Sequence, residues 1–453
     1  MPDNNIPQIL IQPLKPALIA GMAQKLQVLV RVQAPDAAPA ENKLRKPYHL
    51  ALVIDRSGSM SGPPLVEAVR CARHMIDRLE PTDRASLVVF DDRVRTLAPA
   101  QPVGDRRTLY NALATVHPGG STNLHGGWLA GANELLPDVG AAALARVVLL
   151  SDGNANVGDI TDTAGIAALC AQAAERGVTT STYGLGRDFN EDLMVEMAKR
   201  GGGNHYYGDT AADLLEPFAE EFDFISNLYA RQVRLSLAAP QGVTIRLIND
   251  YLVEGDGVMP VIRLPDIAFG AEAWALVELE IPAGLAATGA ASLLQAAVTA
   301  ATPEGIPIAF IDATLTLDAV APAVWEALLA DALVVTRRAE LDAGRLLEQA
   351  RQAAEYGDWA AIERLLAEAR QRFADQPWLI EVLANMAEIA KSMDAARFKK
   401  EALYSSRRMG SRLAAKEELL AMSLDEESAK ASFLRRKTAQ GKAQFDKPDD
   451  SQK

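Results

Sequence analysis

The pattern of hydrophobic and polar positions divides the chain into four successive regions. Apolar and polar residues alternate across residues 8–35, which is typical of β-strands. Across residues 50–228, short apolar runs alternate with helical patterns. A second β-type region begins at residue 231, and after Pro322 the chain becomes rich in Ala, Glu, Leu and Arg with helical periodicity. The sequence therefore predicts β, α/β, β and α regions in that order.

In the second region, strands and helices alternate. Apolar runs such as Leu50–Ile54 and Arg146–Leu150 are bounded by turn residues, which is typical of buried strands. Pro63 and Pro64 mark the start of a helix. Alternation of this kind implies a doubly wound, Rossmann-like parallel sheet that is covered by helices on both faces. The predicted strands are residues 50–54, 85–90, 94–97, 146–150, 178–185 and 206–207, and the predicted helices are residues 65–79, 105–116, 124–136, 161–176, 191–199 and 211–228.

The β-type regions on either side of the α/β region are predicted to form one structure. Six strand candidates separated by Gly and Pro follow the α/β region, which is typical of an antiparallel β-sandwich. The strands of residues 8–34 have no later partner before the α/β region begins. The economical solution is that they pair into the later sheet, so that the α/β domain is inserted in a β-sandwich. The six candidates are residues 233–237, 243–247, 258–264, 274–281, 293–300 and 308–317.

The last region is predicted to be a C-terminal helical bundle. Three helical patterns at residues 346–356, 359–373 and 378–392 are joined by short turns, and the helical composition continues to about residue 436. The polar residues 437–453 are predicted to be disordered. The predicted domains are residues 1–46 (N-terminal strands of the sandwich), 47–229 (α/β domain), 230–320 (remainder of the sandwich), 321–436 (helical domain) and 437–453 (disordered tail).

Composition narrows the class of protein. The 453 residues are 49% hydrophobic and 23% charged, which is ordinary for a globular protein. A net charge of -13 argues against nucleic acid as a partner, because phosphate binding needs a basic surface. Cys71 and Cys170 have no neighbours at metal-ligand spacing and are predicted to be buried, reduced thiols. No secretory signal or run of 18 apolar residues is visible, so a cytoplasmic location without a membrane span is predicted.

Three separated pieces of the sequence carry the candidate chemistry. Asp55 ends a predicted strand, and Ser57 and Ser59 follow at alternate positions. Asp152 follows a second buried strand, and Thr122 lies in a loop with two glycines. In an open parallel sheet, ligands bind at the carboxyl ends of the strands. Carboxylate and hydroxyl oxygens suit a hard divalent cation, so a cation site is predicted at this edge.

In this order, Asp-x-Ser-Gly-Ser, Thr and Asp-Gly resemble the von Willebrand factor type A (VWA) domain over roughly residues 47–228. They match all five positions of the metal-ion-dependent adhesion site of that family. The resemblance implies that Asp55, Ser57, Ser59, Thr122 and Asp152 surround Mg²⁺, some of them through water. The flanking sheet and the helical region resemble bacterial intracellular members, in which this domain lies within a β-sandwich.

The charges of the ligands indicate how such a site could work. Mg²⁺ prefers six oxygen ligands in a nearly octahedral shell. If one of Asp55 and Asp152 acts only through water, the ion stays short of negative charge, and a Glu or Asp carboxylate of another protein can take an open position. Mn²⁺ or Ca²⁺ would also accept these ligands, although the small hydroxyl-rich shell favours Mg²⁺. The predicted function is metal-dependent capture of an acidic partner protein by an intracellular interaction or scaffold protein.

Two other classes of function remain as alternatives. A Mg²⁺-dependent phosphoester hydrolase would use Asp55 as nucleophile, but Ser57 stands where such sites usually carry a second carboxylate. No nucleophile elbow, P-loop or His-Glu-x-x-His motif occurs, so the chain is predicted not to be an enzyme. A scaffold would instead bind through residues 323–453 and keep a structural metal site. An ATPase chaperone is a possible partner by analogy with bacterial relatives only.

Overall fold

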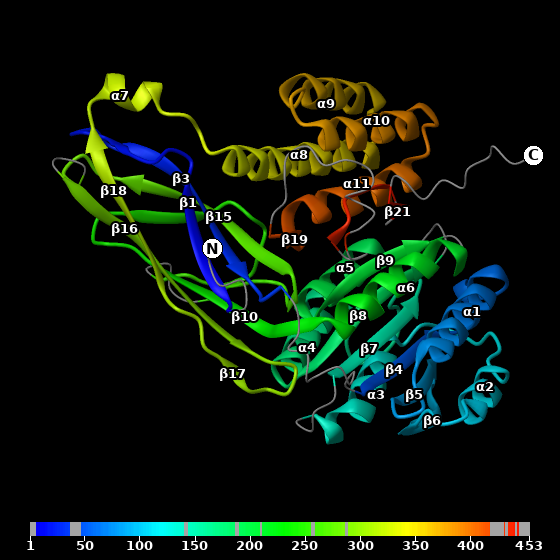
Figure 1. Ribbon diagram of the computed structural model, residues 1–453. Coiled ribbons are helices and arrows are strands. Elements are labelled where there is room, and N and C mark those ends of the chain that lie inside the picture. Colours follow the sequence, from blue (N-terminus) through cyan, green and yellow to red (C-terminus); the bar gives the residue numbers. More distant parts are fainter. Residues whose placement is uncertain are drawn as a thin grey trace, which may run out of the picture.

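The chain forms three adjoining parts, an α/β domain, two antiparallel sheets and a group of helices (Figure 1). The computed structural model describes residues 6–36, 47–139, 144–185, 190–208, 211–254, 259–285, 289–416, 430, 434–439 and 442–443. Among the helices in these ranges, none combines the length and apolar character needed to cross a lipid bilayer.

The α/β domain is built on a six-stranded sheet with the strand order β6-β5-β4-β7-β8-β9. All neighbouring strands are parallel except β6, which runs antiparallel to β5. This confirms the predicted Rossmann-like α/β domain. The strands are β4 (Tyr48–Asp55), β5 (Arg84–Phe90), β6 (Val94–Pro102), β7 (Leu144–Ser151), β8 (Val178–Leu185) and β9 (Gly202–Gly208).

Helices cover both faces of this sheet because its central strands are apolar on both sides. In β4, Leu50, Leu52 and Ile54 join one core, whereas Ala51 and Val53 join the other. The first core includes α1 and α6, and the second includes α3, α4 and α5. The helices of this domain are α1 (Pro63–Arg78), α2 (Arg107–Leu113), α3 (Leu124–Leu135), α4 (Thr163–Glu175), α5 (Glu191–Arg200) and α6 (Ala211–Ser226).

Glycines allow α3 to lie very close to the sheet. A Cβ atom at Gly127 would lie 2.3 Å from Cδ1 of Phe90, and one at Gly131 would lie 2.4 Å from Cγ2 of Val53. Both distances are far below van der Waals contact, so only glycine fits at these two positions without a shift of the helix. The close packing places the start of α3, and the loop before it, beside the carboxyl ends of β4 and β5.

The second part consists of two mainly antiparallel sheets. One has the order β1-β3-β15-β11, with β19 also paired to β15, and the other has the order β12-β13-β10-β16-β18-β2, with β14 on β10 and β17 on β16. Their strands are β1 (Gln8–Pro13), β2 (Leu18–Ile19), β3 (Gln24–Gln33), β10 (Leu228–Ala238), β11 (Thr244–Leu247), β12 (Val253–Glu254), β13 (Val261–Arg263), β14 (Ile267–Ala268), β15 (Ala271–Ile281), β16 (Ala290–Ala301), β17 (Pro307–Ile308), β18 (Ala313–Val320) and β19 (Ala414–Ala415).

Strands from before and after the α/β domain pair directly in this part. Residues Gln24–Gln33 of β3 pair in antiparallel register with Glu272–Ile281 of β15. Alternate residues of β3, such as Val28 and Val30, share one core with Leu235 of β10 in the other sheet. The chain therefore leaves one of these sheets to form the α/β domain and returns to the other through β10.

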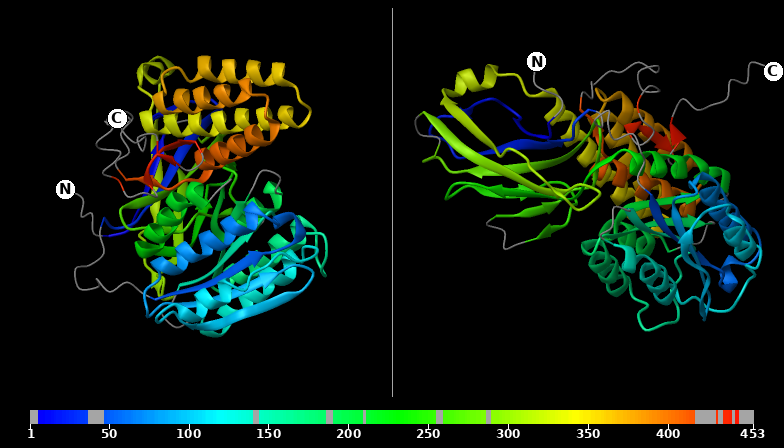
Figure 2. Two further views of the ribbon diagram at one scale, coloured as in Figure 1. Left: turned by 90° about the vertical axis from the view of Figure 1, so that its right-hand side faces the viewer. Right: turned by 60° about the horizontal axis from the view of Figure 1, so that its bottom comes forward.

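The helical part packs on both other parts. Four long helices lie side by side beyond the α/β domain (Figure 2). Their core contains residues such as Leu347, Leu383 and Phe398. The helices are α7 (Pro322–Ala327), α8 (Ala332–Glu355), α9 (Trp359–Arg372), α10 (Pro377–Lys391) and α11 (Ala395–Ser411).

The C-terminal stretch differs from the sequence prediction. The helical pattern was expected to reach residue 436, but α11 ends at Ser411 and the chain then adds β19 to β15. Disorder was predicted for residues 437–453, yet β20 (Lys437–Ala439) and β21 (Lys442–Ala443) form a short antiparallel pair. Residues 440–441 and 444–453 lie outside the described residues.

Candidate metal site at the carboxyl edge of the α/β sheet

Asp55 is the last residue of β4, and its carboxylate is fully buried. Its Oδ1 accepts a hydrogen bond from the backbone N–H of Ser57 at 2.9 Å, and the hydroxyl of Ser57 lies 3.2 Å from that of Ser59. Ser57 is buried, whereas Ser59 is exposed. The turn after β4 thus folds both hydroxyl-bearing residues back towards the end of the strand.

Asp152 lies immediately after β7, the strand next to β4. Ser151, the last residue of β7, donates its hydroxyl to Oδ2 of Asp55 at 2.6 Å. The backbone carbonyl of Asp152 accepts the N–H of Asn190 at 2.8 Å, which joins this loop to the start of α5. Gly153 follows with φ of 69°, and a Cβ there would lie 2.9 Å from the carbonyl oxygen of Asn190. Glycine is therefore required at position 153 by the close contact with the start of α5.

Burial, hydrogen bonds and a neighbouring charge all affect the pKa of Asp55. The pKa of Asp55 is raised to about 6, because burial and, to a smaller extent, the negative charge of Asp152 outweigh the lowering by the hydrogen bonds from Ser151 and Ser57. The hydrogen bond from Ser151 to Asp55 places Asp152, the next residue, close to the end of β4. A bound cation would favour the ionised form of both groups.

The loop that carries Thr122 is tied to both other loops by backbone and side-chain hydrogen bonds. The N–H of Gly58 donates to the carbonyl of Gly120 at 2.7 Å, and the N–H of Gly119 donates to the carbonyl of Arg56 at 2.7 Å. The N–H of Thr122 donates to Oδ1 of Asn156, in the loop after β7, at 2.8 Å. These bonds hold the buried Thr122 at the edge of the sheet where Asp55 and Asp152 lie.

A largely buried ion pair also connects the loops of this edge. Arg56 lies between Asp55 and Ser57 in sequence, but its guanidinium pairs with Oδ2 of Asp91 at 2.6 Å. Burial raises the pKa of Asp91, but hydrogen bonds from Arg93 and Gly120 and the charge of Arg56 bring it below its ordinary value. The positive charge of Arg56 is thus balanced by Asp91.

These residues fit a hard divalent cation. Within the part of the chain that the structure describes, no three His, Cys, Asp or Glu side chains gather at one point. A cation here would therefore depend on the two carboxylates of Asp55 and Asp152 together with hydroxyl oxygens and water, which is the donor chemistry of Mg²⁺.

Sequence reasoning did not select several residues that support the site. Ser151 was recognised only as part of the turn after a strand, although it holds Asp55. Asn156, which holds Thr122, and Asp91, which pairs with Arg56, had no signal of their own. The position of Ser151 at a strand end, one residue before Asp152, is the one feature that could have identified it.

Comparison with known proteins agrees with this geometry. Residues 49–221 match the family model of the von Willebrand factor type A domain. The chain contains a VWA domain. An uncharacterized protein of Synechocystis sp. is 27% identical over 266 residues, a match that covers 56% of this chain and 61% of that protein. The chain therefore spans about three fifths of the length of this relative.

Two solved structures share the fold well beyond the VWA domain. The von Willebrand factor type A structure from Catenulispora acidiphila is 16% identical with a TM-score of 0.64, and the match covers 84% of this chain and 90% of that one. The ArnB paralog VWA2 from Sulfolobus acidocaldarius is 17% identical with a TM-score of 0.56, covering 88% of this chain and 99% of that one. The likeness therefore includes sheets and helices outside residues 49–221 and concerns the fold alone.

Proposed function

We propose that the VWA domain is a divalent-metal-dependent protein-binding module that captures a Glu or Asp side chain of a partner protein. VWA domains commonly mediate protein–protein interaction and typically bind a divalent metal. The observation that carries the proposal is the buried carboxylate of Asp55, which is bonded to Ser151, the residue before Asp152, with Ser57 and Ser59 in the turn between the strand and α1.

In this proposal, each residue of the site has a distinct role. Asp55 and Asp152 supply negative charge, and Ser57, Ser59 and Thr122 supply neutral oxygens. Bound Mg²⁺, or Mn²⁺ or Ca²⁺ in its place, would supply a positive charge that attracts a carboxylate from outside. The hydrogen bonds from Ser57 and Ser151 hold Asp55 in one orientation, so the site needs little reorganisation when it binds. The exposed position of Ser59 puts the open side of the site at the surface.

We further propose that this domain is inserted in a β-sandwich, as in bacterial intracellular VWA proteins. The ten-residue pairing of β3 with β15 and the core shared by the two sheets support this arrangement. Cys71 and Cys170 are buried free thiols, which suits the reducing cytoplasm. In that compartment the protein would act in assembly or as a scaffold rather than as an enzyme.

Metal binding tests the proposal directly. The full-length protein is titrated with Mn²⁺ and the free ion is measured by electron paramagnetic resonance. Asp55→Ala is expected to abolish binding, and Ser151→Ala is expected to weaken it about 10–100-fold, as for other residues that orient a ligand. Asp83→Asn is the matched control, because Asp83 is a buried carboxylate at the start of β5, away from the carboxyl edge, where it accepts the N–H groups of Tyr48 and Glu80 at 2.8 and 2.7 Å. Unchanged Mn²⁺ affinity in Asp55→Ala would refute the metal site.

Partner binding is tested separately by affinity capture with Mg²⁺ and with EDTA. Partners captured by the wild type and by Asp83→Asn in Mg²⁺ are expected to be lost in EDTA and with Asp55→Ala. A partner that remains bound in EDTA and is lost only when residues 323–453 are deleted would instead support binding through the helical part.

A further inference from the structure

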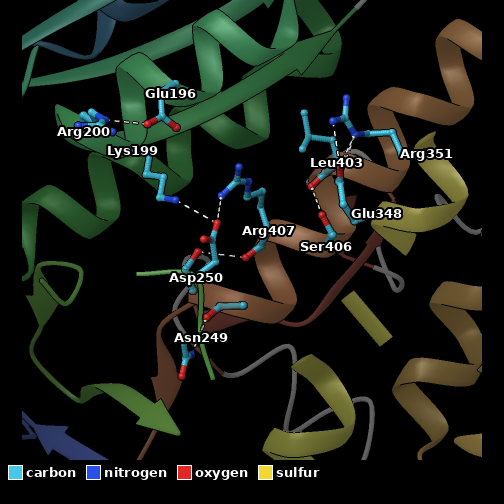
Figure 3. A network of polar contacts seen from close by, with 12 residues as sticks. Glu196, Lys199, Arg200, Asn249, Asp250, Glu348, Arg351, Leu403, Ser406 and Arg407 are labelled. Carbon is cyan, nitrogen blue, oxygen red and sulfur yellow. Dashed lines mark hydrogen bonds and ion pairs between the residues drawn. The ribbon is translucent and has the colours of Figure 1, made fainter. Parts of the chain in front are cut away.

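A large cavity lies where the three parts of the chain meet. It has a volume of about 600 Å³ and is lined by α5 and β9 of the VWA domain, by β10 and the loop after β11, and by α8 and α11. This volume lies within the range of roughly 300–1,000 Å³ that is usual for small-molecule sites. Figure 3 shows the polar side chains that meet there from the three parts.

One cluster in the wall of the cavity keeps a positive charge. Twelve Arg and Lys residues and seven Asp and Glu residues line it, but several of the twelve pair with carboxylates outside the lining, such as Arg146 with Glu221 and Arg412 with Glu340. Lys199 and Arg407 share a single carboxylate oxygen of Asp250, at 3.0 and 2.8 Å, so this cluster keeps a positive charge (Figure 3). A concave site with surplus positive charge concentrates anions.

Several donors around the cavity lack acceptors. Nε of Arg231, Nε of Arg408 and the hydroxyls of Tyr251 and Tyr404 are buried and have no hydrogen-bond partner in the described part of the chain. All four residues line the cavity. Arginine N–H groups can only donate, and buried donors are normally paired with protein, water or a ligand. The wall of the cavity therefore contains buried donors of Arg231 and Arg408 that have no acceptor among the described residues.

The rest of the wall is apolar. Val195 and Ala198 of α5 and Leu403 of α11 are buried residues that line it. One further side is the edge strand β9, which pairs only with β8 among the described strands. A ligand for this cavity thus needs an apolar body as well as an anionic group.

We propose that the cavity binds a small amphipathic organic anion, with a carboxylate, sulfonate or phosphate group and an apolar or aromatic body. Because all three parts contribute to the wall, the bound molecule would stabilise their docking on one another. This proposal is independent of the metal site and of the partner carboxylate.

The probe for this site is 8-anilinonaphthalene-1-sulfonate, an amphipathic anion whose fluorescence rises in apolar surroundings. Arg345 and Arg338 of α8 provide a matched pair of variants. Both pair with Asp342, at 3.4 and 3.0 Å, but only Arg345 lines the cavity, where it also donates to the carbonyl of Ile248 at 2.9 Å. Arg345→Gln is expected to weaken dye binding to the full-length protein about tenfold, the effect of losing one hydrogen bond to a charged group. Arg338→Gln is expected to leave it unchanged.

Two further measurements distinguish dye binding in the cavity from dye binding at other apolar surfaces. The neutral analogue N-phenyl-1-naphthylamine is expected to bind the wild type and Arg345→Gln equally, because it lacks the anionic group. Ala198→Trp, which fills the cavity, is expected to remove binding of both dyes, whereas Ile311→Trp at a site 79% exposed is not. Equal binding of the anionic dye to wild type, Arg345→Gln and Arg338→Gln would overturn the proposal, as would a tenfold loss of the neutral dye in Arg345→Gln.

Discussion

A buried carboxylate holds the last helix of the VWA domain on its sheet. Glu221 of α6 pairs with the guanidinium of Arg146 on β7 and accepts the hydroxyl of Ser181 on β8 at 2.6 Å. On β9, the side-chain amide of Asn204 and the hydroxyl of Tyr206 donate to its Oε2 at 2.6 and 3.2 Å. One side chain therefore links α6 to three neighbouring strands.

Loss of this negative charge is expected to be costly. The side chain of Arg146 is only 1% exposed, so Glu221→Gln would leave a buried cation without its closest anion. Breaking one partner of a buried pair costs about 3–5 kcal/mol. The free energy of unfolding of a domain is about 5–15 kcal/mol, so the variant should lose a large part of the stability of the VWA domain. Gln keeps the volume and one acceptor oxygen, so the change tests charge rather than packing.

The measurement is hydrogen exchange with mass spectrometry, because it reports the stability of α6 and β7–β9 separately from the other parts of the chain. Exchange at pH 7 is expected to accelerate in these elements in Glu221→Gln. The control is Glu196→Gln, since Glu196 forms a partly exposed pair with Arg200 at 2.7 Å and should contribute no more than about 0.5 kcal/mol. Equal losses in both variants, or a loss below about 1 kcal/mol in Glu221→Gln, would refute the reasoning.

Two other predictions concern packing and pH. Gly127→Ala would place a Cβ 2.3 Å from Phe90 and is expected to cost about 1–3 kcal/mol in thermal unfolding, whereas Gly410→Ala, where a Cβ meets nothing within 4 Å, should not destabilise α11. Burial lowers the pKa of His205 from 6.5 to about 3, so the unfolded chain takes up a proton there before the folded chain does. The stabilising effect is present above pH 6.5 and is lost as the pH falls towards 3. Replacement by Gln should therefore flatten the dependence of the urea midpoint on pH in that window, and an unchanged slope would contradict the assignment.

The helices and strands that could be predicted from the sequence are those in which a single physical cause determines the order of polar and apolar residues. The strand Val178–Leu185 was predicted with the bounds that the structure has, because β-branched and aromatic residues lie between Gly177 and Gly186. The sequence predicts helical structure after Pro322 but a separate helix only at Leu346–Tyr356, whereas α8 begins at Ala332. In its first turns, Arg337 and Glu340 are fully buried and pair at 2.8 Å, so charged residues occupy the inner face and hide the helical pattern.

The glycines at residues 201–203 are a second place where the residue pattern did not predict the bounds of an element. The sequence predicts a helix at residues 191–199 and a strand only at residues 206–207, but β9 already begins at Gly202. A Cβ at Gly203 would lie 2.3 Å from the carbonyl oxygen of Thr180, so the glycines let β9 approach β8. A local pattern cannot distinguish a glycine that ends a helix from one that is needed for close contact with a strand more than twenty residues earlier.

The metal site and the cavity also differ in how far they could be predicted from the sequence. Asp55 and Asp152 could be selected because each stands at the end of a strand that is itself visible in the sequence, and parallel strands bring their carboxyl ends to one edge. The cavity depends instead on side chains such as Lys199, Asp250 and Arg407, which come from three regions with different periodicity and meet only through tertiary packing. No local pattern records their proximity, and the positive charge of this cluster arises only when the three parts are placed together. A site made by one sheet edge can thus be inferred from sequence, whereas a site made by the docking of separate parts requires the structure.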